Sequence, residues 1–367
     1  MRHSLDRTLL ILTVVIVIFG FLIFSSASLG LLAREGASFS SVALSQILFG
    51  IVGGGIAFFL TSTIHYRWWR EYAFWIFIAT LVLTLAVFIP GLGFAHGGAR
   101  RWILLGSFSM QPSEFLKMGF TIYMATWLSG MKSHISDWKK GALPFIALVG
   151  GVGIIMLLQP DTDTYLIMVS ASLAMFITAG GKIRDVVIMG LAGILLLATL
   201  AFFRPYIKDR IEIFLNPASD PQGSGYQIKQ SLIAVGSGGF IGRGFGQSIQ
   251  KFEYLPEPIG DSIFAVYAEE FGFLGSVVLV LLFSGLALRG YRIASHAQDL
   301  FGMLLAVGIT TIIIAQVFLN IAAMLAIAPL SGLPLPLISH GGTALLVTLA
   351  ALGIVLNVSR YQKPSSV

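Results

Sequence analysis

The chain has 367 residues, of which 56% are hydrophobic and only 11% are charged. Soluble domains carry about 25% charged residues, so this composition excludes an ordinary soluble protein and predicts one that lies in a membrane. There is no cysteine, which excludes disulfides and thiolate chemistry, and the formal charge of +6 indicates basic loops rather than nucleic-acid binding. We therefore expect one membrane domain over residues 1–367, without a nucleic-acid partner.

Ten apolar runs follow one another, and each predicts a membrane-spanning helix because lipid offers no partners for unpaired backbone groups. They cover about residues 8–29, 42–63, 72–90, 113–130, 141–158, 164–180, 186–203, 262–288, 300–327 and 343–359. The first run is too long for a signal-peptide core, so we expect a retained anchor. The predicted fold is an all-α polytopic membrane protein.

Lysine and arginine set the predicted orientation. Thirteen of them fall on one side, namely Arg2, Arg7, Arg67, Arg70, Lys132, Lys139, Lys140, Lys182, Arg184, Arg289, Arg292, Arg360 and Lys363. The short loops opposite hold three, which are Arg34, Arg100 and Arg101. Because cytoplasmic loops carry the basic excess, both termini are predicted to be cytoplasmic, and the long polar interval 204–261 to face outward.

The outward segment 91–112 is rich in glycine and is predicted to be a loop. It carries the adjacent residues Arg100, Arg101 and Trp102. Anchoring at the membrane interface is one explanation of arginine beside tryptophan. Anion capture is the other, because a guanidinium group offers a planar fork to phosphate oxygens. The segment alone leaves both explanations open.

Residues 111–117 (Gln-Pro-Ser-Glu-Phe-Leu-Lys) are typical of a helix start, since proline and an acidic residue suit the first turn. Glu114 and Lys117 are three residues apart and can pair on one helical face. Pairing explains Glu114 well. Lys117 lies inside an apolar segment, where a lysine costs about 2.5–3.5 kcal/mol at the helix centre, so we predict a functional role for it.

A second outward turn contains Asp161 and Asp163. Capping of the following helix is the simpler explanation of these carboxylates. They could instead line a polar cavity or bind a hard cation through oxygen ligands.

The interval 204–261 is predicted to be structured. Ile207, Ile211, Phe214 and Leu215 recur at helical spacing among charged residues, which predicts an amphipathic helix on the membrane interface. Glycine-rich residues 236–246 lack the strand and the Lys-Ser/Thr pair of a nucleotide-binding loop. Glycine here instead allows a close approach of the backbone to a ligand or a helix.

Asp261 ends this interval, just before an apolar run, where a helix cap alone would explain it. Glu269 and Glu270 follow two turns deeper, and such carboxylates are costly in a membrane unless they face a polar interior. His340 lies in a proline-rich outward loop, where a satisfied loop histidine is favoured over a proton shuttle.

Six motifs follow one another along the chain, namely residues 98–103 (Gly-Ala-Arg-Arg-Trp-Ile), 111–117, 159–161 (Gln-Pro-Asp), 236–239 (Gly-Ser-Gly-Gly), 250–257 (Gln-Lys-Phe-Glu-Tyr-Leu-Pro-Glu) and 332–336 (Gly-Leu-Pro-Leu-Pro). With these motifs in this order, the whole chain resembles the SEDS family (shape, elongation, division and sporulation), the polytopic peptidoglycan glycosyltransferases. The first and fifth motifs resemble the division branch, FtsW, more than the elongation branch, RodA. The sequence departs from the family at four positions, which are Ile259, Gly260, Ser262 and His340.

The resemblance implies polymerisation of lipid II into glycan strands for cell division or elongation, on the outer face of the bacterial cytoplasmic (inner) membrane. It implies that Asp261 is the catalytic carboxylate. The candidate substrate-binding residues are Arg101, Lys117, Glu253, Glu114, Arg100 and Lys251. The implied partners are a class B penicillin-binding protein (a transpeptidase), other divisome or elongasome membrane proteins, and membrane lipid.

In the expected reaction, Asp261 accepts the proton of a sugar hydroxyl while Arg101, Lys117 or both neutralise the departing lipid diphosphate. Diphosphate leaves as a stabilised anion, so the general acid of glycoside hydrolysis can be dispensed with, and attack from the opposite face predicts inversion. A divalent cation, Mg²⁺ or Mn²⁺, is an open addition, with Asp261, Glu253 and Asp161 as its candidate ligands. No organic cofactor is expected.

Two other functions remain open at this point. A lipid II flippase would use the intramembrane charges as a pathway, but such carriers show polar groups in both membrane halves or an internal repeat, and neither is visible. A scaffold would recruit the transpeptidase without chemistry of its own.

Overall fold

The computed structural model describes residues 5–30, 39–96, 99–105, 108–132, 134–203 and 205–362. Five residues used above lie outside this part of the chain, which are Arg2, Arg34, Gly98, Arg204 and Lys363.

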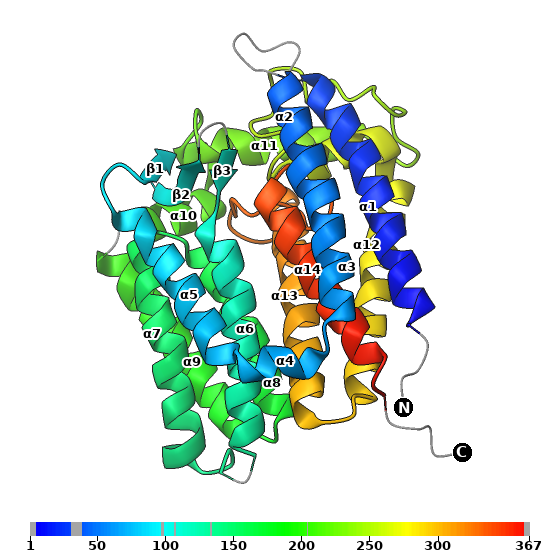
Figure 1. The fold of residues 1–367 in the computed structure, drawn as a ribbon. Helices are drawn as coiled ribbons and strands as arrows, with labels where there is room; N and C mark the ends of the chain where they lie inside the picture. The colour runs from blue at the N-terminus through cyan, green and yellow to red at the C-terminus, as the bar shows by residue number, and fades with distance from the viewer. Residues whose placement is uncertain are drawn as a thin grey trace.

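Ten helical segments coincide with the ten predicted runs (Figure 1). They are α1 (Arg7–Ser28); α2 (Phe39–Ser45) continued by η2 (Gln46–Gly53) and α3 (Gly54–Thr63); α5 (Ala73–Leu85) continued by η3 (Ala86–Phe88); α6 (Pro112–Gly130); η4 (Trp138–Ala142) continued by α7 (Leu143–Leu158); α8 (Thr162–Thr178); α9 (Ile183–Phe203); α12 (Ile263–Ser295); α13 (Leu300–Met324); and α14 (Gly342–Ser359). In the described chain, seven of these are long and apolar enough to cross a membrane, and α8 and the α5–η3 stretch are shorter apolar helices. The chain is therefore a polytopic, mainly helical membrane protein.

Both chain ends lie at one end of the helix bundle, opposite to the small sheet and α11 (Ser224–Ser237) (Figure 1). The backbone nitrogen of Asp6 donates to Ser359 Oγ at 3.3 Å. The Asp6 carboxylate caps α1 through Leu9 N at 2.9 Å and pairs with Arg289 of α12 at 2.6 Å. These contacts tie α1, α12 and α14 together at the end that holds both termini, as the predicted orientation requires.

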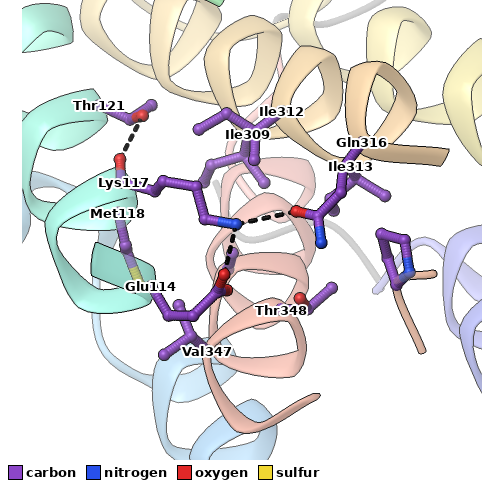
Figure 2. A pocket seen from close by; sticks show the side chains of 12 residues that line it. Glu114, Lys117, Met118, Thr121, Ile309, Ile312, Ile313, Gln316, Val347 and Thr348 are labelled. Carbon is purple, nitrogen blue, oxygen red and sulfur yellow. Dashed lines mark hydrogen bonds and ion pairs between the residues drawn. The ribbon is translucent and has the colours of Figure 1, made fainter. Parts of the chain in front are cut away.

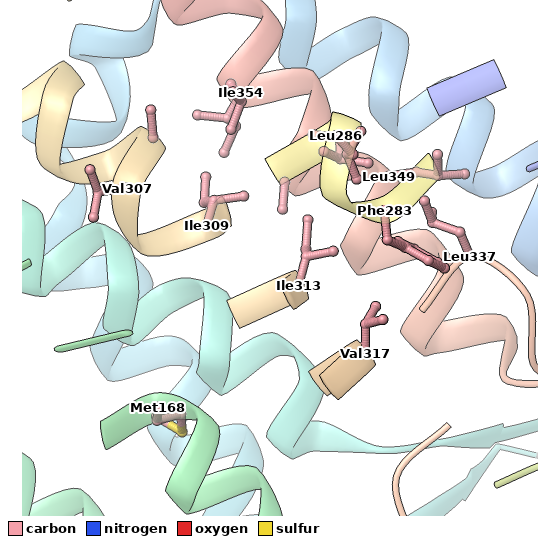
Figure 3. Close-up of a cluster of buried hydrophobic side chains, with 14 of the residues drawn as sticks. Met168, Phe283, Leu286, Val307, Ile309, Ile313, Val317, Leu337, Leu349 and Ile354 are labelled. Carbon is pink, nitrogen blue, oxygen red and sulfur yellow. The ribbon is translucent and has the colours of Figure 1, made fainter. Parts of the chain in front are cut away.

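The core is centred on α13, whose apolar residues pack against several other helices. Figure 3 shows Ile309, Ile313 and Val317 of α13 among side chains of α8, α12 and α14. By contrast, α9 lies at the periphery and buries only Asp185. In a membrane protein such an exposed apolar helix is covered by lipid.

The segment 91–112 was predicted to be a loop, and that prediction is wrong. It forms an antiparallel sheet of β1 (Gly93–His96), β2 (Ala99–Leu105) and β3 (Phe108–Met110), in the order β1-β2-β3. In the register, Phe94 faces Trp102 and Ile103 faces Met110. Side chains alternate along a strand, so Ile103 is buried and Leu104 is exposed.

The run 262–288 was predicted to be one uninterrupted helix, but α12 is broken at Gly272, where φ is 64° and ψ is −161°. The glycine-rich loop fills the break, since Phe273 N and Leu274 N donate to the carbonyls of Gly239 and Phe240 at 2.9 and 3.1 Å. A Cβ on Gly272 would lie 2.3 Å from Gly242 N. The predicted close approach of backbone at these glycines is therefore confirmed, with a helix as the neighbour.

The long polar interval forms α10 (Pro205–Leu215), the short turn η5 (Pro217–Ser219) and α11. The amphipathic helix predicted around Ile207 and Ile211 is confirmed as α10. On the side of the termini, α4 (Tyr66–Glu71) connects the second and third long helices.

Candidate functional site

The backbone that carries Asp261 is held at three consecutive carbonyl groups. His340 N donates to Ile259 O at 2.7 Å, Ser339 Oγ to Gly260 O at 2.6 Å, and Asn320 Nδ2 to Asp261 O at 2.7 Å. The donors come from α13 and from the proline-rich loop before α14. The position of Asp261 is thus set by elements about 60–80 residues further along the chain.

The carboxylate of Asp261 is half-buried, and its Oδ1 accepts hydrogen bonds from Gln227 Nε2 at 3.1 Å and from Ser262 Oγ at 3.4 Å. The helix cap of α12 is Ser262, so capping does not explain Asp261. Burial, with a smaller contribution from the nearby Glu257 carboxylate, raises the pKa of Asp261 to about 7, against the two hydrogen bonds, which lower it. A carboxylate with such a pKa is suited to accept a proton at neutral pH.

Asp261 lines a pocket of about 120 Å³ between the outer helices and the proline-rich loop. The other lining residues are Arg210 and Ile213 from α10, Ser224 and Ile228 from α11, and Leu330 and Gly332. About 10–15 Å³ suffices for one water molecule, so this pocket admits a polar group of several atoms. Gln227 and Arg210 were not predicted to belong to the site, because neither stands out from its neighbours in the sequence.

Arg101 belongs to β2, and its side chain lies against the polar turn that precedes α8. Its Nη1 is 3.8 Å from Asp161 Oδ1, its Nε donates to Gln159 O at 3.3 Å, and its Nη2 contacts the Pro160 carbonyl. Ser113 Oγ donates to the other oxygen of Asp161 at 3.0 Å. Three of the predicted motifs therefore meet here. Arg100, the preceding residue of β2, is exposed and does not take part in these contacts.

Arg210 connects this turn to the Asp261 pocket. Its Nη1 lies 2.8 and 2.7 Å from the two carboxylate oxygens of Asp163. Its guanidinium carbon lies 4.6 Å from the centre of the Tyr206 ring, and the Tyr206 hydroxyl is 3.4 Å from Arg101 Nη2. Polar contacts thus run from Arg101 through Tyr206 and Arg210 to the pocket that contains Asp261.

Lys117 and Glu114 form the predicted ion pair, with Lys117 Nζ 2.8 Å from Glu114 Oε1 (Figure 2). Lys117 Nζ also donates to Gln316 Oε1 at 2.8 Å, and all three side chains are buried. Gln316 in turn donates to the Pro334 carbonyl at 2.8 Å. In this structure Lys117 therefore supports the loop that holds Asp261, and its ammonium group lies beside a cavity of only about 30 Å³.

Lys251 is fully buried and anchors the outer loop. Its Nζ lies 2.8 Å from Glu270 Oε1, 3.1 Å from Ser26 Oγ and 2.9 Å from the Gly246 carbonyl. Glu269 accepts a hydrogen bond from Ser248 Oγ at 2.6 Å. The expected polar surroundings of Glu269 and Glu270 are thus provided by the folded loop, and Lys251 belongs to that cluster rather than to the Asp261 pocket.

The three candidate metal ligands are not brought together. Among the described residues, no group of three or more histidine or acidic side chains could hold a metal ion. Asp161 is buried against Arg101 and Ser113, and Glu253 is exposed in a loop with a φ of 66°. His340 stacks on Phe24 with 5.9 Å between ring centres and does not line the pocket, so the shuttle alternative gains no support.

The chain is similar to known proteins over nearly its whole length. The sequence profile FTSW_RODA_SPOVE, described as cell cycle protein, matches residues 6–364. The chain is 41% identical to stage V sporulation protein E of Bacillus subtilis strain 168, covering 99% of both sequences. It is 39% identical to the probable peptidoglycan glycosyltransferase FtsW of Geobacter sulfurreducens, over 98% of this chain and 96% of that one.

Two solved structures share the fold. One chain comes from work on a peptidoglycan synthase complex that coordinates polymerization and crosslinking; it has a TM-score of 0.80 and 29% identity, over 98% of this chain and 99% of that one. The other is the rod shape determining protein RodA of Thermus thermophilus, with a TM-score of 0.70 and 28% identity, over 98% and 99% of the two chains.

Proposed function

Because the chain belongs to the cell cycle protein family of FtsW, RodA and SpoVE, we propose that it is a peptidoglycan glycosyltransferase that polymerises lipid II into glycan strands. The observation that carries this proposal is the half-buried Asp261 in a pocket that also contains a guanidinium group. Relatives named FtsW near 40% identity favour cell division as the process, with elongation as the alternative.

In the proposed reaction Asp261 is the general base, and two neighbouring amides position it. Asp261 takes the proton from the attacking sugar hydroxyl, for which a pKa of about 7 is well suited. The hydroxyl oxygen bonds to the anomeric carbon as the bond from that carbon to the diphosphate breaks. Attack opposite to the leaving group gives inversion. Gln227 and Asn320 hold the side chain and the backbone of Asp261 in place.

A divalent cation fits this site only if the substrate supplies some of its ligands. Mg²⁺ is commonly bound by one or two carboxylates, substrate phosphates and water, and it neutralises phosphate charge when bound. Asp261 and the nearby Glu257 are carboxylates of that kind. We therefore propose that any cation arrives with the diphosphate of the substrate rather than in a cage made by the protein alone.

The cytoplasmic membrane is the proposed location, with the Asp261 pocket on its outer face. Both termini lie at the opposite end of the bundle, and the positive-inside rule supports a cytoplasmic location for that end (Figure 1). The proposed partner is a class B penicillin-binding protein, because a structural neighbour belongs to a complex that couples polymerization to crosslinking.

The test is glycan-chain formation from lipid II by the purified protein with its cognate transpeptidase, beside lipid II translocation in sealed vesicles. We expect polymer, and we expect Asp261→Asn to abolish it while the protein stays folded. Translocation without polymer would support the flippase alternative instead. If the protein showed neither activity, a scaffold function would be the remaining explanation. Of the four charges that a flippase would use, Glu114 and Lys117 are paired with each other beside a small cavity. The other two, Glu269 and Glu270, are bound by the folded outer loop.

A further inference from the structure

Arg210 and Asp261 line the same pocket but come from different segments of the chain. Arg210 comes from the amphipathic helix α10, and its side chain keeps 24% of its surface exposed. Asp163 binds only one nitrogen of the guanidinium group, Nη1. Within the described chain, Nε and Nη2 of Arg210 donate no hydrogen bond. The group is therefore fixed in place while most of its donors remain available.

The two cations that the sequence predicted to neutralise the diphosphate, Arg101 and Lys117, are occupied by other contacts. Arg101 contacts the carbonyls of Gln159 and Pro160, and its side chain is 16% exposed. Lys117 is buried between Glu114 and Gln316. Neither residue lines the pocket that contains Asp261. Among these three cations, only Arg210 combines spare hydrogen-bond donors with a place in the pocket.

Two neighbouring residues hold the guanidinium group of Arg210 in an orientation that can bind an anion. The Asp163 carboxylate orients the guanidinium plane, and the Tyr206 ring covers one face at 4.6 Å. A preorganised fork binds phosphate oxygens through two parallel hydrogen bonds, which a lysine cannot reproduce. A hydrogen-bond donor of this kind stabilises the transition state most strongly where negative charge develops in a site shielded from water.

We propose that Arg210 binds the diphosphate of the lipid-linked donor and stabilises it as it leaves. As the new glycosidic bond forms, the bond between the anomeric carbon and the diphosphate oxygen breaks, and that oxygen keeps the electron pair. The proton of the attacking hydroxyl passes to Asp261 across the same pocket. This assignment rests on the proposed glycosyltransferase function and names the residue that receives the leaving group.

The test compares Arg210→Ala, Arg210→Lys and the control Lys208→Ala, which changes an exposed lysine two residues away on the same helix. The full-length protein is assayed with its transpeptidase partner for kcat and KM on lipid II. Binding of polyprenyl diphosphate, the released product, is measured separately by thermophoresis. Arg210→Ala should lower kcat by about 10²–10³-fold, as loss of a transition-state donor does. Product binding should weaken at least tenfold, whereas Lys208→Ala should match the wild type.

Arg210→Lys keeps the charge and removes the fork, so it should retain the fold and recover only part of both losses. If either Arg210 variant, shown to be folded by thermal unfolding, bound polyprenyl diphosphate as tightly as the wild type, the assignment would be wrong. That result would leave the glycosyltransferase function intact as long as the wild type made polymer. A wild type that bound the product but made no polymer would count against the proposed function instead, because the binding measurement needs no turnover.

Discussion

The side-chain amide of Asn320 donates one hydrogen bond to the carbonyl oxygen of Asp261 at 2.7 Å and another to that of Leu333 at 2.8 Å. Asn320 is fully buried near the outer end of α13. Asp261 lies on one wall of the pocket, and Leu333 follows Gly332 on another wall. One amide group therefore sets the spacing between the two walls, which makes Asn320 a positioning residue for the proposed base.

Substitution of Asn320 should consequently affect turnover more than substrate binding. Asn320→Leu removes both hydrogen bonds and leaves buried carbonyls unsatisfied, at a cost of about 1–3 kcal/mol in the free energy of unfolding. We expect kcat per folded molecule to fall at least tenfold, with a smaller change in KM. The measurement is lipid II polymerisation normalised to the folded fraction. A purely structural role would lower the unfolding temperature and leave kcat per folded molecule unchanged.

The pH dependence of polymerisation should report the pKa of Asp261. Only the ionised carboxylate can accept a proton, so kcat/KM should fall as the pH drops below about 7. The nearby Glu257 carboxylate contributes to the raised pKa, so Glu257→Gln should move this acid limb to lower pH. If the acid limb of kcat/KM lay at the same pH in the wild type and in the Glu257→Gln variant, a group other than Asp261 would control the pH dependence.

Gln227→Leu should move the same limb in the opposite direction. Gln227 Nε2 donates to the ionised carboxylate at 3.1 Å, which lowers the pKa of Asp261. Removal of this donor should raise the pKa, move the acid limb to higher pH and reduce the rate at neutral pH. Opposite shifts in the Glu257 and Gln227 variants cannot arise from general destabilisation. A downward shift in Gln227→Leu would contradict the observed hydrogen bond.

Chelation distinguishes a cation carried by the substrate from one held by the protein. The described residues include no group of three candidate ligands, so EDTA should leave the unfolding temperature of the substrate-free protein unchanged. If a cation joins the diphosphate at Asp261, EDTA should lower polymerisation, and Mg²⁺ or Mn²⁺ should restore it. A lower unfolding temperature in EDTA would indicate a metal site built by the protein itself.

The helices were predictable from sequence because the membrane allows each apolar run only one way to satisfy its backbone. The amphipathic helix α10 was predictable from its period. The sheet was missed because the segment is rich in glycine and carries Arg100 and Arg101, which suggested a polar loop. The break at Gly272 was missed because the residues on both sides of it are apolar and continue the helical pattern.

The residues of the candidate site were predictable only in part. A carboxylate before an apolar run drew attention to Asp261, and an intramembrane charge drew attention to Lys117. Sequence could not show that the proline-rich loop holds Asp261, because that contact joins residues far apart in the chain. Gln227 and Asn320 are neutral amides whose importance lies in where they donate. Lys251 was predicted to bind substrate, yet its ammonium group is fully buried against Glu270.

The pair Glu114–Lys117 offers a last prediction, because its charges lie 2.8 Å apart and are almost entirely buried. Removal of one partner leaves an uncompensated charge in an apolar setting, which costs about 3–5 kcal/mol, whereas replacement of both is often close to neutral. Lys117→Met should therefore destabilise the protein strongly, and Glu114→Gln with Lys117→Met should recover most of the loss. The measurement is thermal unfolding in detergent, beside polymerisation of lipid II.

The double variant also separates structure from catalysis at this pair. If Lys117 acts only by supporting the proline-rich loop through Gln316, recovery of stability should be accompanied by recovery of most of the polymerisation rate. If its ammonium group also binds diphosphate, the stable double variant should remain inactive and bind polyprenyl diphosphate weakly. The structure favours the first outcome, since Lys117 Nζ already has two buried partners and does not line the pocket of Asp261 and Arg210.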